Sequence, residues 1–380
     1  MDERSTLSGA RLGYFVTERK VAKKVFGDFL GRCDKEGIVA EDLLQKRGRG
    51  VDEGQMAAAA PLDCVLQHVS DLQGRDRDGD GHVRPLLREL KGFLKDNPSV
   101  PVVDPLTPVR RLANRYKMCR LIKKHLSFED VGVPPFALIK KSYDYEKRLR
   151  VVRSKDLVFP LLAKSAQAHR HTMHVVFNER GLGQLGGLRF PIVLQKFIPH
   201  DGTLFKVYVI GTKSWVVRRP SLRNLQADAA RDNEEFATYD VSKANSHHRE
   251  LSARRTPERD QGVWSAPDDS RVARLVERVS KRTSLTLYGL DLILETSTGR
   301  HYLIDINYFP GYEGIEDVGD HLFEHLKQLI TASFHRRQAR AVAAATAAAT
   351  DQPTTTAAAV ANEDGGGSTA SEPTLTEILD

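Results

Sequence analysis

Alternating hydrophobic and polar positions predict strands along this chain, and apolar positions three and four residues apart predict helices. In the first hundred residues the two patterns follow one another: strands are expected at 12–16, 38–44 and 62–69, and helices at 18–31 and 83–96. The polar, Gly- and Ala-rich stretch 46–60 is expected to be a loop. Alternation of strands and helices is typical of an α/β layer, so we expect an N-terminal α/β domain over residues 11–107, after a flexible segment 1–10.

The chain beyond residue 107 is richer in predicted strands. A basic helix is expected at 108–125, helices at 272–280 and 320–334, and strands at 136–139, 157–164, 192–197, 203–210 and 215–217. The polar, charged stretch 225–266 has few apolar residues, which predicts a mobile insertion in a domain spanning 108–334. The Ala-, Thr- and Gly-rich composition of 335–380 predicts a disordered tail whose Ala runs could hold transient helix.

A β-hairpin followed by a turn, residues 284–313, carries the clearest chemical signal. Two β-rich runs flank a short polar connection ending in Gly299. Side chains at i and i+2 share a face of a strand, so Asp305 and Asn307 should lie together, with Ile304 pointing away, and Asp291 could meet them across the hairpin. Carboxylates and a carboxamide are hard oxygen donors, so the trio predicts a Mg²⁺ site; the alternative is that these residues only end a strand.

Composition narrows the class of protein without deciding its function. The 380 residues are 40% hydrophobic and 28% charged, which is ordinary for a globular protein with two or three domains. With neither a signal peptide pattern nor a run of about 18 apolar residues, we expect a cytoplasmic or nuclear protein without integral membrane contact. Three cysteines, Cys33, Cys64 and Cys119, are too far apart in the sequence to predict a disulfide framework or a zinc site.

The charge of the chain favours anionic ligands. There are 57 Lys and Arg against 50 Asp and Glu, a net charge of +7. Lys164 ends an apolar run and Lys206 lies inside a strand; each could simply point to solvent, but beside a carboxylate metal site both could hold nucleotide phosphates. Gln195 could contact adenine or be an ordinary polar strand residue. With aromatic content of only 7% and no recognisable RNA or DNA module, we do not expect nucleic acid binding.

Three further segments could bind anions. A basic patch with a serine inside it suits a multiply phosphorylated ligand, although an ordinary basic loop is equally consistent; it consists of Arg218, Arg219, Ser221 and Arg223. Residues 17–20 open a helix, whose N-terminus favours anions. One of His169, His171 and His174 could contact phosphate; zinc is not expected there, because no Cys or acidic partner is nearby.

Other nucleotide- and metal-binding signatures are missing. The acidic turn 76–81 resembles a calcium loop, but Leu87 stands where an EF-hand needs its bidentate Glu, so we interpret it as a surface turn. There is no GxxxxGK[ST] loop and no protein-kinase signature such as HRD or DFG. If the chain transfers phosphate, it must use a different nucleotide-binding fold.

Several segments together resemble the inositol-tetrakisphosphate 1-kinases, also called inositol 1,3,4-trisphosphate 5/6-kinases. The resemblance covers about residues 11–334 and rests on LGYFVTERK, VPPFAL, FPLLAK, FIPHDGTLFKVYVIG, RRPSLRN and above all YGLDLILETSTGRHYLIDINYFPGYEG. It implies a mixed α/β (α+β) ATP-grasp fold, in which a Rossmann-like N-terminal domain precedes two subdomains that enclose the nucleotide. It also implies a monomeric kinase that transfers the γ-phosphoryl group of ATP to an inositol tris- or tetrakisphosphate at the 1-, 5- or 6-position, and possible activity on hexakisphosphate.

The resemblance assigns roles by position. Two Mg²⁺ ions would be held by Asp291, Asp305 and Asn307, and Lys206, Asp305 and Asn307 would be catalytic. ATP, the co-substrate, would be bound by Arg115, Lys164, Gln195, Lys206, Ser221, Thr238 and Ser242, where Thr238 replaces a serine of the relatives. The inositol phosphate would be bound by Lys20, His171, Lys206, Arg219, Asn307 and Gly311.

Two departures from the family pattern leave alternatives open. The loop after Lys164 is about three residues shorter than in relatives, so its substrate-contacting histidine aligns with His171 when counted backward and His174 when counted forward. A His-Lys pair of relatives is Gln67-His68 here, which would remove one substrate cation. An ATP-grasp carboxylate–amine ligase and an inositol phosphate binder with little catalytic activity are the alternative functions.

Overall fold

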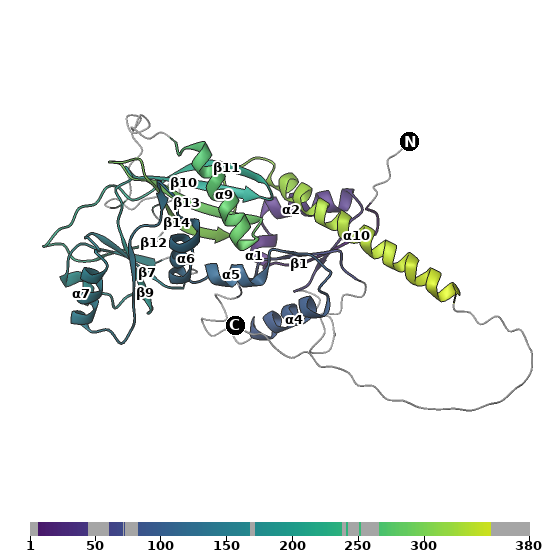
Figure 1. Ribbon diagram of the computed structural model, residues 1–380, viewed down its shortest axis with the longest axis horizontal. Helices are drawn as coiled ribbons and strands as arrows, with labels where there is room; N and C mark the ends of the chain where they lie inside the picture. The colour runs from purple at the N-terminus through teal and green to yellow at the C-terminus, as the bar shows by residue number, and fades with distance from the viewer. Residues whose placement is uncertain are drawn as a thin grey trace, which may run out of the picture. The chain divides into compact units, whose positions relative to one another are not determined.

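The computed structural model describes residues 7–44, 61–70, 72, 83–167, 172–237, 241, 251 and 266–350. The chain divides into two compact units, Met1–Arg337 and Gln338–Asp380, and all the sheets and the candidate site belong to the first. Within that unit the described strands form one four-stranded and two five-stranded sheets (Figure 1). None of the helices in the described ranges is long and apolar enough to cross a membrane.

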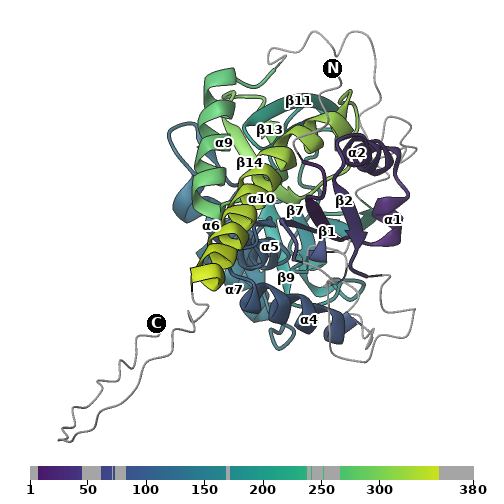
Figure 2. The same cartoon turned by 90° about the vertical axis from the view of Figure 1, so that its right-hand side faces the viewer.

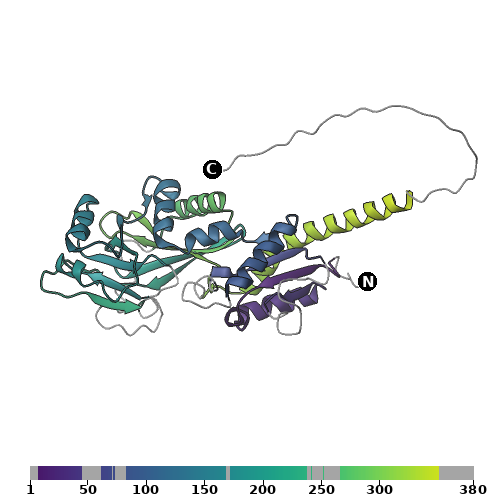
Figure 3. The same ribbon diagram turned by 90° about the horizontal axis from the view of Figure 1, so that it is seen from below.

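The N-terminal sheet confirms the expected α/β layer. Its order is β2-β1-β3-β4, with every neighbouring pair parallel, and it is built from β1 (Arg11–Phe15), β2 (Val39–Asp42), β3 (Cys64–Gln67) and β4 (Val102–Val103). Helices α2 (Lys24–Lys35) and α4 (Val83–Asp96) contribute buried side chains to its core, and Figure 3 shows helices on both sides of the purple strands. The loop predicted at 46–60 and the acidic turn 76–81 lie outside the described residues.

Two predicted helices are each broken by a residue with extended backbone. The helix expected at 18–31 is α1 (Glu18–Val21) followed by α2, because Lys23 between them is extended with ψ 137°. The helix expected at 108–125 is α5 (Leu106–Leu112), α6 (Arg115–Leu121) and a short π-helix (Ile122–Leu126). Asn114 is extended between α5 and α6, and its side chain accepts a hydrogen bond from Lys117 N, which caps α6.

The second sheet has the order β12-β8-β7-β9-β6 and is antiparallel. It consists of β6 (Phe136–Ile139), β7 (Leu161–Ser165), β8 (Thr172–Val176), β9 (Ile192–Lys196) and β12 (Glu234–Ala237), and α7 (Tyr145–Ser154) packs on it. The sequence patterns missed α7, β8 and β12, whose apolar runs are short. Since β12 pairs with β8, residues 234–237 are not part of a mobile insertion, contrary to our expectation.

The third sheet contains the predicted hairpin. Its order is β11-β10-β13-β14-β5, formed by β5 (Val131–Gly132), β10 (Thr203–Ile210), β11 (Lys213–Pro220), β13 (Leu287–Leu294) and β14 (His301–Tyr308). Only β5 pairs in parallel. Helix α9 (Asp269–Thr283) buries three apolar side chains in the core that it shares with these strands: Val272, Leu275 and Val279.

Both ends of the described chain are more ordered than the composition predicted. Leu7 and Ala10, expected in a flexible segment, are buried in the main core. Helix α10 (Val318–Thr350) continues well beyond the predicted 320–334, so residues 335–350 are helical rather than disordered, because Ala is the best helix former. Residues 351–380 lie outside the described part of the chain.

A continuous hydrophobic core joins the N-terminal sheet to the third sheet. It contains Phe26 and Phe29 of α2, Leu290 of β13, and Leu322 and Phe323 of α10. Figures 1 and 2 show α2 beside the start of α10, where Arg32 pairs with Asp320 across 2.9 Å. Apolar packing therefore crosses the expected domain boundary at residue 107. The division into two domains at this residue stays a prediction.

Candidate active site

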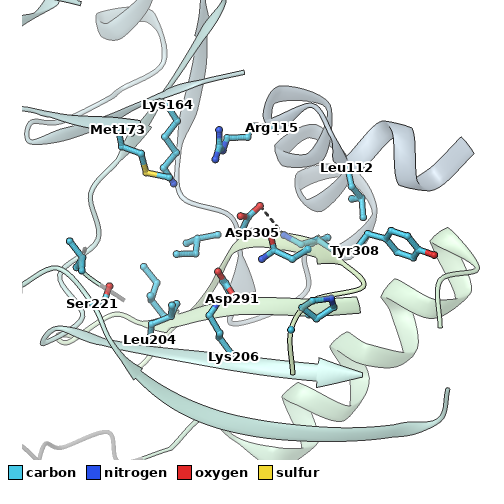
Figure 4. A pocket seen from close by; sticks show the side chains of 18 of the residues that line it. Leu112, Arg115, Lys164, Met173, Leu204, Lys206, Ser221, Asp291, Asp305 and Tyr308 are labelled. Carbon is cyan, nitrogen blue, oxygen red and sulfur yellow. Dashed lines mark hydrogen bonds and ion pairs between the residues drawn. The ribbon is translucent and has the colours of Figure 1, made fainter. Parts of the chain in front are cut away.

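A cavity of about 820 Å³ is lined by strands of the second and third sheets and by residues that follow β1 and β3 of the N-terminal sheet, such as Thr17 and His68. One wall consists of strands β7, β8 and β9 and the opposite wall of β10, β13 and β14. Figure 4 shows Lys164 and Arg115 on one side of this space and Asp291, Asp305 and Lys206 on the other. Ten of the predicted site residues line it: Lys20, Arg115, Lys164, Gln195, Lys206, Ser221, Asp291, Asp305, Asn307 and Gly311.

The acidic residues lie in the predicted register. Asp291 pairs with Asp305 across the hairpin, and Gly289 pairs with Asn307. A register shift follows Asp291, and it makes one detail of our prediction wrong: Ile304 packs in a small cluster that includes Ile198, Leu204 and Ile293, all of which line the cavity. The reason is that a bulge adds one residue to a strand and so changes which side chains share its face.

The donor set fits a divalent cation such as Mg²⁺. In the described ranges no three side chains of the His, Cys, Asp and Glu types converge, so the donors are two carboxylates and the Asn307 carboxamide. Such a set leaves several coordination positions for phosphate oxygens or water, which is usual for Mg²⁺ at nucleotide sites. The residues therefore fit the expected metal, and which of them would hold it remains a proposal.

Lys206 contacts one of these carboxylates directly. Its Nζ donates to Asp291 Oδ1 over 2.8 Å, and the side chains are only 24% and 14% exposed. Burial lowers the pKa of Lys206, but contact with Asp291 outweighs that effect, so the pKa of Lys206 is raised. Burial raises the pKa of Asp291, and Lys206 opposes the rise. Lys206 therefore remains charged at neutral pH, as a phosphate-binding residue requires.

Two buried cations face the carboxylates. Lys164 Nζ donates to Gln195 Oε1 over 2.8 Å, so its described partner is an amide and not a carboxylate. Arg115 Nη1 donates to the carbonyl oxygens of Ser165 and Gln167, each over 2.9 Å. Burial and the nearby Arg115 lower the pKa of Lys164, and burial lowers that of Arg115. The hydrogen-bond acceptors named here are neutral, and an anionic ligand would add to the stabilisation that both buried cations receive from the Asp305 charge.

The turn after β14 forms another part of the cavity lining. Lys20 Nζ donates to the carbonyl oxygens of Phe309 and Pro310, both over 2.7 Å, and lies 3.9 Å from the Phe309 ring centroid. Lys20 therefore holds this turn in addition to lining the cavity. A Cβ added at Gly311 in the turn would meet the Glu313 carboxylate, the end of a flexible and largely exposed side chain that can move aside.

Several predicted residues fall outside the cavity lining. Arg219 Nη2 donates to Glu313 O over 2.6 Å, which places it next to a lining residue, whereas Arg218 bonds to Thr203 Oγ1 over 3.3 Å. Arg218, Arg219 and Arg223 are absent from the lining. Thr238, Ser242, His169 and His171 lie outside the described residues.

The structure bears on both departures from the family pattern. His174, the alternative to His171, is buried on β8, lies 3.1 Å from Glu235 and does not line the cavity. Gln67 is part of the buried scaffold, since its Nε2 donates to Asp104 O over 2.6 Å and its Oε1 accepts from Val69 N over 2.9 Å. The neighbouring His68 lines the cavity, and its ring centroid lies 5.4 Å from that of Phe309.

Sequence reasoning missed several lining residues. His200 is buried in the cavity wall, and Met173, Tyr208 and Glu313 also line it. His200 lies in the segment Pro199-His200-Asp201-Gly202, which we interpreted only as a turn between strands. A histidine shortly after the strand that contains Gln195 was the available signal.

Comparison with known proteins decides the family. Residues 125–328 match the model of a family described as "Inositol 1,3,4-trisphosphate 5/6-kinase ATP-grasp domain". An inositol-tetrakisphosphate 1-kinase of Xenopus laevis is 31% identical over 85% of this chain and 80% of the relative. The chain belongs to this family. Inositol-tetrakisphosphate 1-kinase 3 of Oryza sativa subsp. indica is likewise 30% identical, over 86% of this chain and 84% of its own.

Solved structures of other ATP-grasp proteins share the fold of this family member. The D-alanine–D-alanine ligase of Bacillus anthracis in complex with ATP is 17% identical, with a TM-score of 0.50 over 87% of this chain and 99% of the ligase. The ADP complex of an N5-carboxyaminoimidazole ribonucleotide synthetase is 13% identical, with a TM-score of 0.51 over 87% of this chain and 79% of its own. At these identities the likeness confirms the ATP-grasp fold and nothing finer.

Proposed function

We propose that the protein is an inositol polyphosphate kinase that transfers the γ-phosphoryl group of ATP to a hydroxyl group of an inositol tris- or tetrakisphosphate. The observation that carries the proposal is the opposition of two buried cations, Lys164 and Arg115, to the carboxylates of Asp291 and Asp305 across one cavity. The phosphates of a nucleotide would be complementary to the two cations, and a divalent cation bound to them would be complementary to the carboxylates. Family membership supplies the class of acceptor.

We assign the roles of the residues from their charge, their place in the cavity and the family pattern. Lys164 and Arg115 would bind ATP phosphates, with Gln195 and Ser221 toward the nucleoside, and Lys206 would neutralise charge on the transferred group. Lys20, Arg219, Asn307 and Gly311 would contact the inositol phosphate, assisted by the N-terminal domain 11–107. Thr238, Ser242 and His171 stay proposed ligand contacts from the family alone.

The carboxylates and Asn307 would hold Mg²⁺. When bound, Mg²⁺ neutralises phosphate charge and aligns the phosphates with the acceptor. The protein itself positions the acceptor hydroxyl in line with the γ-phosphoryl group and excludes water, which accounts for most of the catalysis that phosphoryl transfer needs. We also propose that one chain suffices, which light scattering after gel filtration would test.

The test is direct conversion of substrate. The purified protein is incubated with Mg²⁺, ATP and each of a panel of inositol tris- to hexakisphosphates, and the products are separated by ion-exchange chromatography. We expect a more highly phosphorylated product, and its loss in Asp305→Asn, which keeps the size of the side chain but removes its charge. ADP release that requires a carboxylate and an amine, with no inositol phosphate converted, would instead establish the ligase alternative. Binding of ATP and inositol phosphates without conversion would establish the binder.

A further inference from the structure

His200 lies in the turn between β9 and β10 and contacts Ser221, which follows β11. The side chain is 6% exposed, and both residues line the cavity. His200 Nδ1 is 2.6 Å from Ile198 O, and His200 Nε2 is 2.8 Å from Ser221 Oγ. Both ring nitrogens therefore have partners, and those partners determine where the proton sits.

The tautomer follows from the acceptor at Nδ1. A carbonyl oxygen can only accept, so Nδ1 must carry the hydrogen. Burial lowers the pKa of His200 to about 4, so the ring is neutral at physiological pH and Nε2 has no hydrogen. Nε2 must then accept, and the Ser221 hydroxyl must donate to it. The lone pairs of Ser221 Oγ remain available to a ligand, whereas its proton does not.

The turn that holds the imidazole is itself fixed. Asn224 Oδ1 accepts from the backbone N–H groups of His200 and Asp201, over 2.9 and 3.0 Å, and Asn224 Nδ2 donates to Asp201 Oδ1 over 2.6 Å. Ser221 N donates to Gly202 O over 2.8 Å, which continues the pairing of β10 with β11. These contacts fix the backbone at His200 and at Ser221, the two positions from which the imidazole and the hydroxyl meet.

Ser221 lies at the nucleoside end of the cavity. On β11, Val217 pairs with Lys206 of β10. Ser221 lies four residues after Val217, and it pairs with Gly202, which lies four residues before Lys206. Even spacing puts Ser221 on the same face as Lys206, about 13 Å farther along. If the phosphates bind near Lys206, the sugar and base extend toward Ser221. Figure 4 labels Ser221 on the same side of the cavity as Leu204.

We propose that His200 is a specificity-determining residue: by fixing the Ser221 hydroxyl as an acceptor, it selects a nucleoside group that donates a hydrogen bond. This inference rests on the proposed use of ATP. ATP has three such groups away from its phosphates: the 2′-hydroxyl, the 3′-hydroxyl and the 6-amino group. Phosphate oxygens, which only accept, are rejected at this position, so the nucleotide is bound in one direction.

The experiment compares nucleotides that each lack one donor. Dissociation constants of ATP, 2′-deoxy-ATP, 3′-deoxy-ATP and purine riboside triphosphate are measured by calorimetry with Mg²⁺ for the full chain and for His200→Phe, His200→Gln and Ser221→Ala. We expect the wild type to bind one analogue about 5- to 10-fold more weakly than ATP, the value of one hydrogen bond. That ratio should fall to about one in His200→Phe and Ser221→Ala, whereas His200→Gln, whose amide oxygen accepts, should keep it.

A matched control separates specificity from stability. His325 Nε2 lies 2.8 Å from Thr286 Oγ1, a similar pair that does not line the cavity, so His325→Phe should keep the wild-type ratio even if it lowers the unfolding temperature. Equal weakening of all four nucleotides in His200→Phe would overturn the inference. Wild-type binding of all four nucleotides with equal affinity would overturn it while leaving the proposed function intact. No binding of any nucleotide would overturn both.

Discussion

Lys206 Nζ lies 2.8 Å from Asp291 Oδ1, so a proposed phosphate-binding cation is in contact with a proposed metal ligand. The pair bridges neighbouring strands, because Lys206 and Asp291 are register partners of β10 and β13. Without a ligand, each charge neutralises the other. We therefore infer that a divalent cation at Asp291 and the Lys206 ammonium compete for one carboxylate, and that phosphates relieve the competition by binding both.

Replacing Lys206 with methionine should change catalysis and metal binding in opposite directions. Lys206→Met should lower turnover about 100-fold, because an oriented charge at the transferred group is lost. It should also strengthen Mg²⁺ binding in the absence of nucleotide, since Asp291 no longer has a competing partner. Calorimetric Mg²⁺ titration and a coupled ADP assay measure the two effects. Lys213→Met, an exposed change on β11, is the control, and unchanged Mg²⁺ affinity in Lys206→Met would contradict the competition.

Changing Gln195 to glutamate should stabilise the free protein and weaken ATP binding. The new carboxylate would give the buried Lys164 an ionic partner, which offsets part of the cost of burying its charge. The same negative charge would repel the ATP phosphates, so we expect the dissociation constant of ATP to rise about 10-fold or more. Thermal unfolding and calorimetry test this, with the exposed Gln328→Glu as control. An unfolding temperature below that of the wild type would count against it.

The ion pair between Arg337 and Asp63 should be important for stability but not for catalysis. Arg337 Nε and Nη2 donate to both carboxylate oxygens over 2.8 and 2.7 Å, and the Asp63 side chain is completely buried. Arg337→Ala would leave that buried charge with Arg11 N as its described donor, which should lower the free energy of unfolding by about 2–4 kcal/mol.

Urea unfolding of Arg337→Ala, with the exposed Arg336→Ala as its matched control, measures this effect. The double variant with Asp63→Asn should lose less than the sum of the two single changes, because the charge itself is then gone. KM and kcat well below the unfolding temperature should stay near their wild-type values. A loss below about 0.5 kcal/mol in Arg337→Ala would show that the pair is not structural.

The burial of neutral His200 predicts a loss of stability in acid. Its pKa is about 4 in the folded protein and about 6.5 when unfolded, so between these values the unfolded chain binds more protons. The free energy of unfolding should therefore fall as the pH decreases from about 6.5 to 4, by roughly 3 kcal/mol from this group. Other groups also titrate there, so the measurement is the difference between wild type and His200→Gln in urea unfolding at several pH values. Parallel pH profiles for the two proteins would contradict the prediction.

Local sequence was enough to predict the hairpin that carries the acidic residues. Alternation with period two determines which face of a strand a side chain occupies, so this pattern alone places Asp305 and Asn307 together. The short Gly-containing connection predicts that the two runs pair as a hairpin, and in the structure this pairing brings Asp291 opposite Asp305. Ile304 was assigned to the wrong face because a bulge depends on contacts with neighbouring strands, and no local pattern marks it.

Contacts between distant segments decided the rest. The sequence determined the family motifs, the α/β layer and the residue types that bind phosphate and metal, because these follow from short-range periodicity and side-chain chemistry. Only the tertiary structure decided that Lys206 contacts Asp291, that Lys164 contacts Gln195, and that His200 orients Ser221. The two residues of each of these pairs are 21 to 85 positions apart in the sequence. Their burial and the direction of their hydrogen bonds depend on tertiary packing, which no pattern within one strand or helix contains.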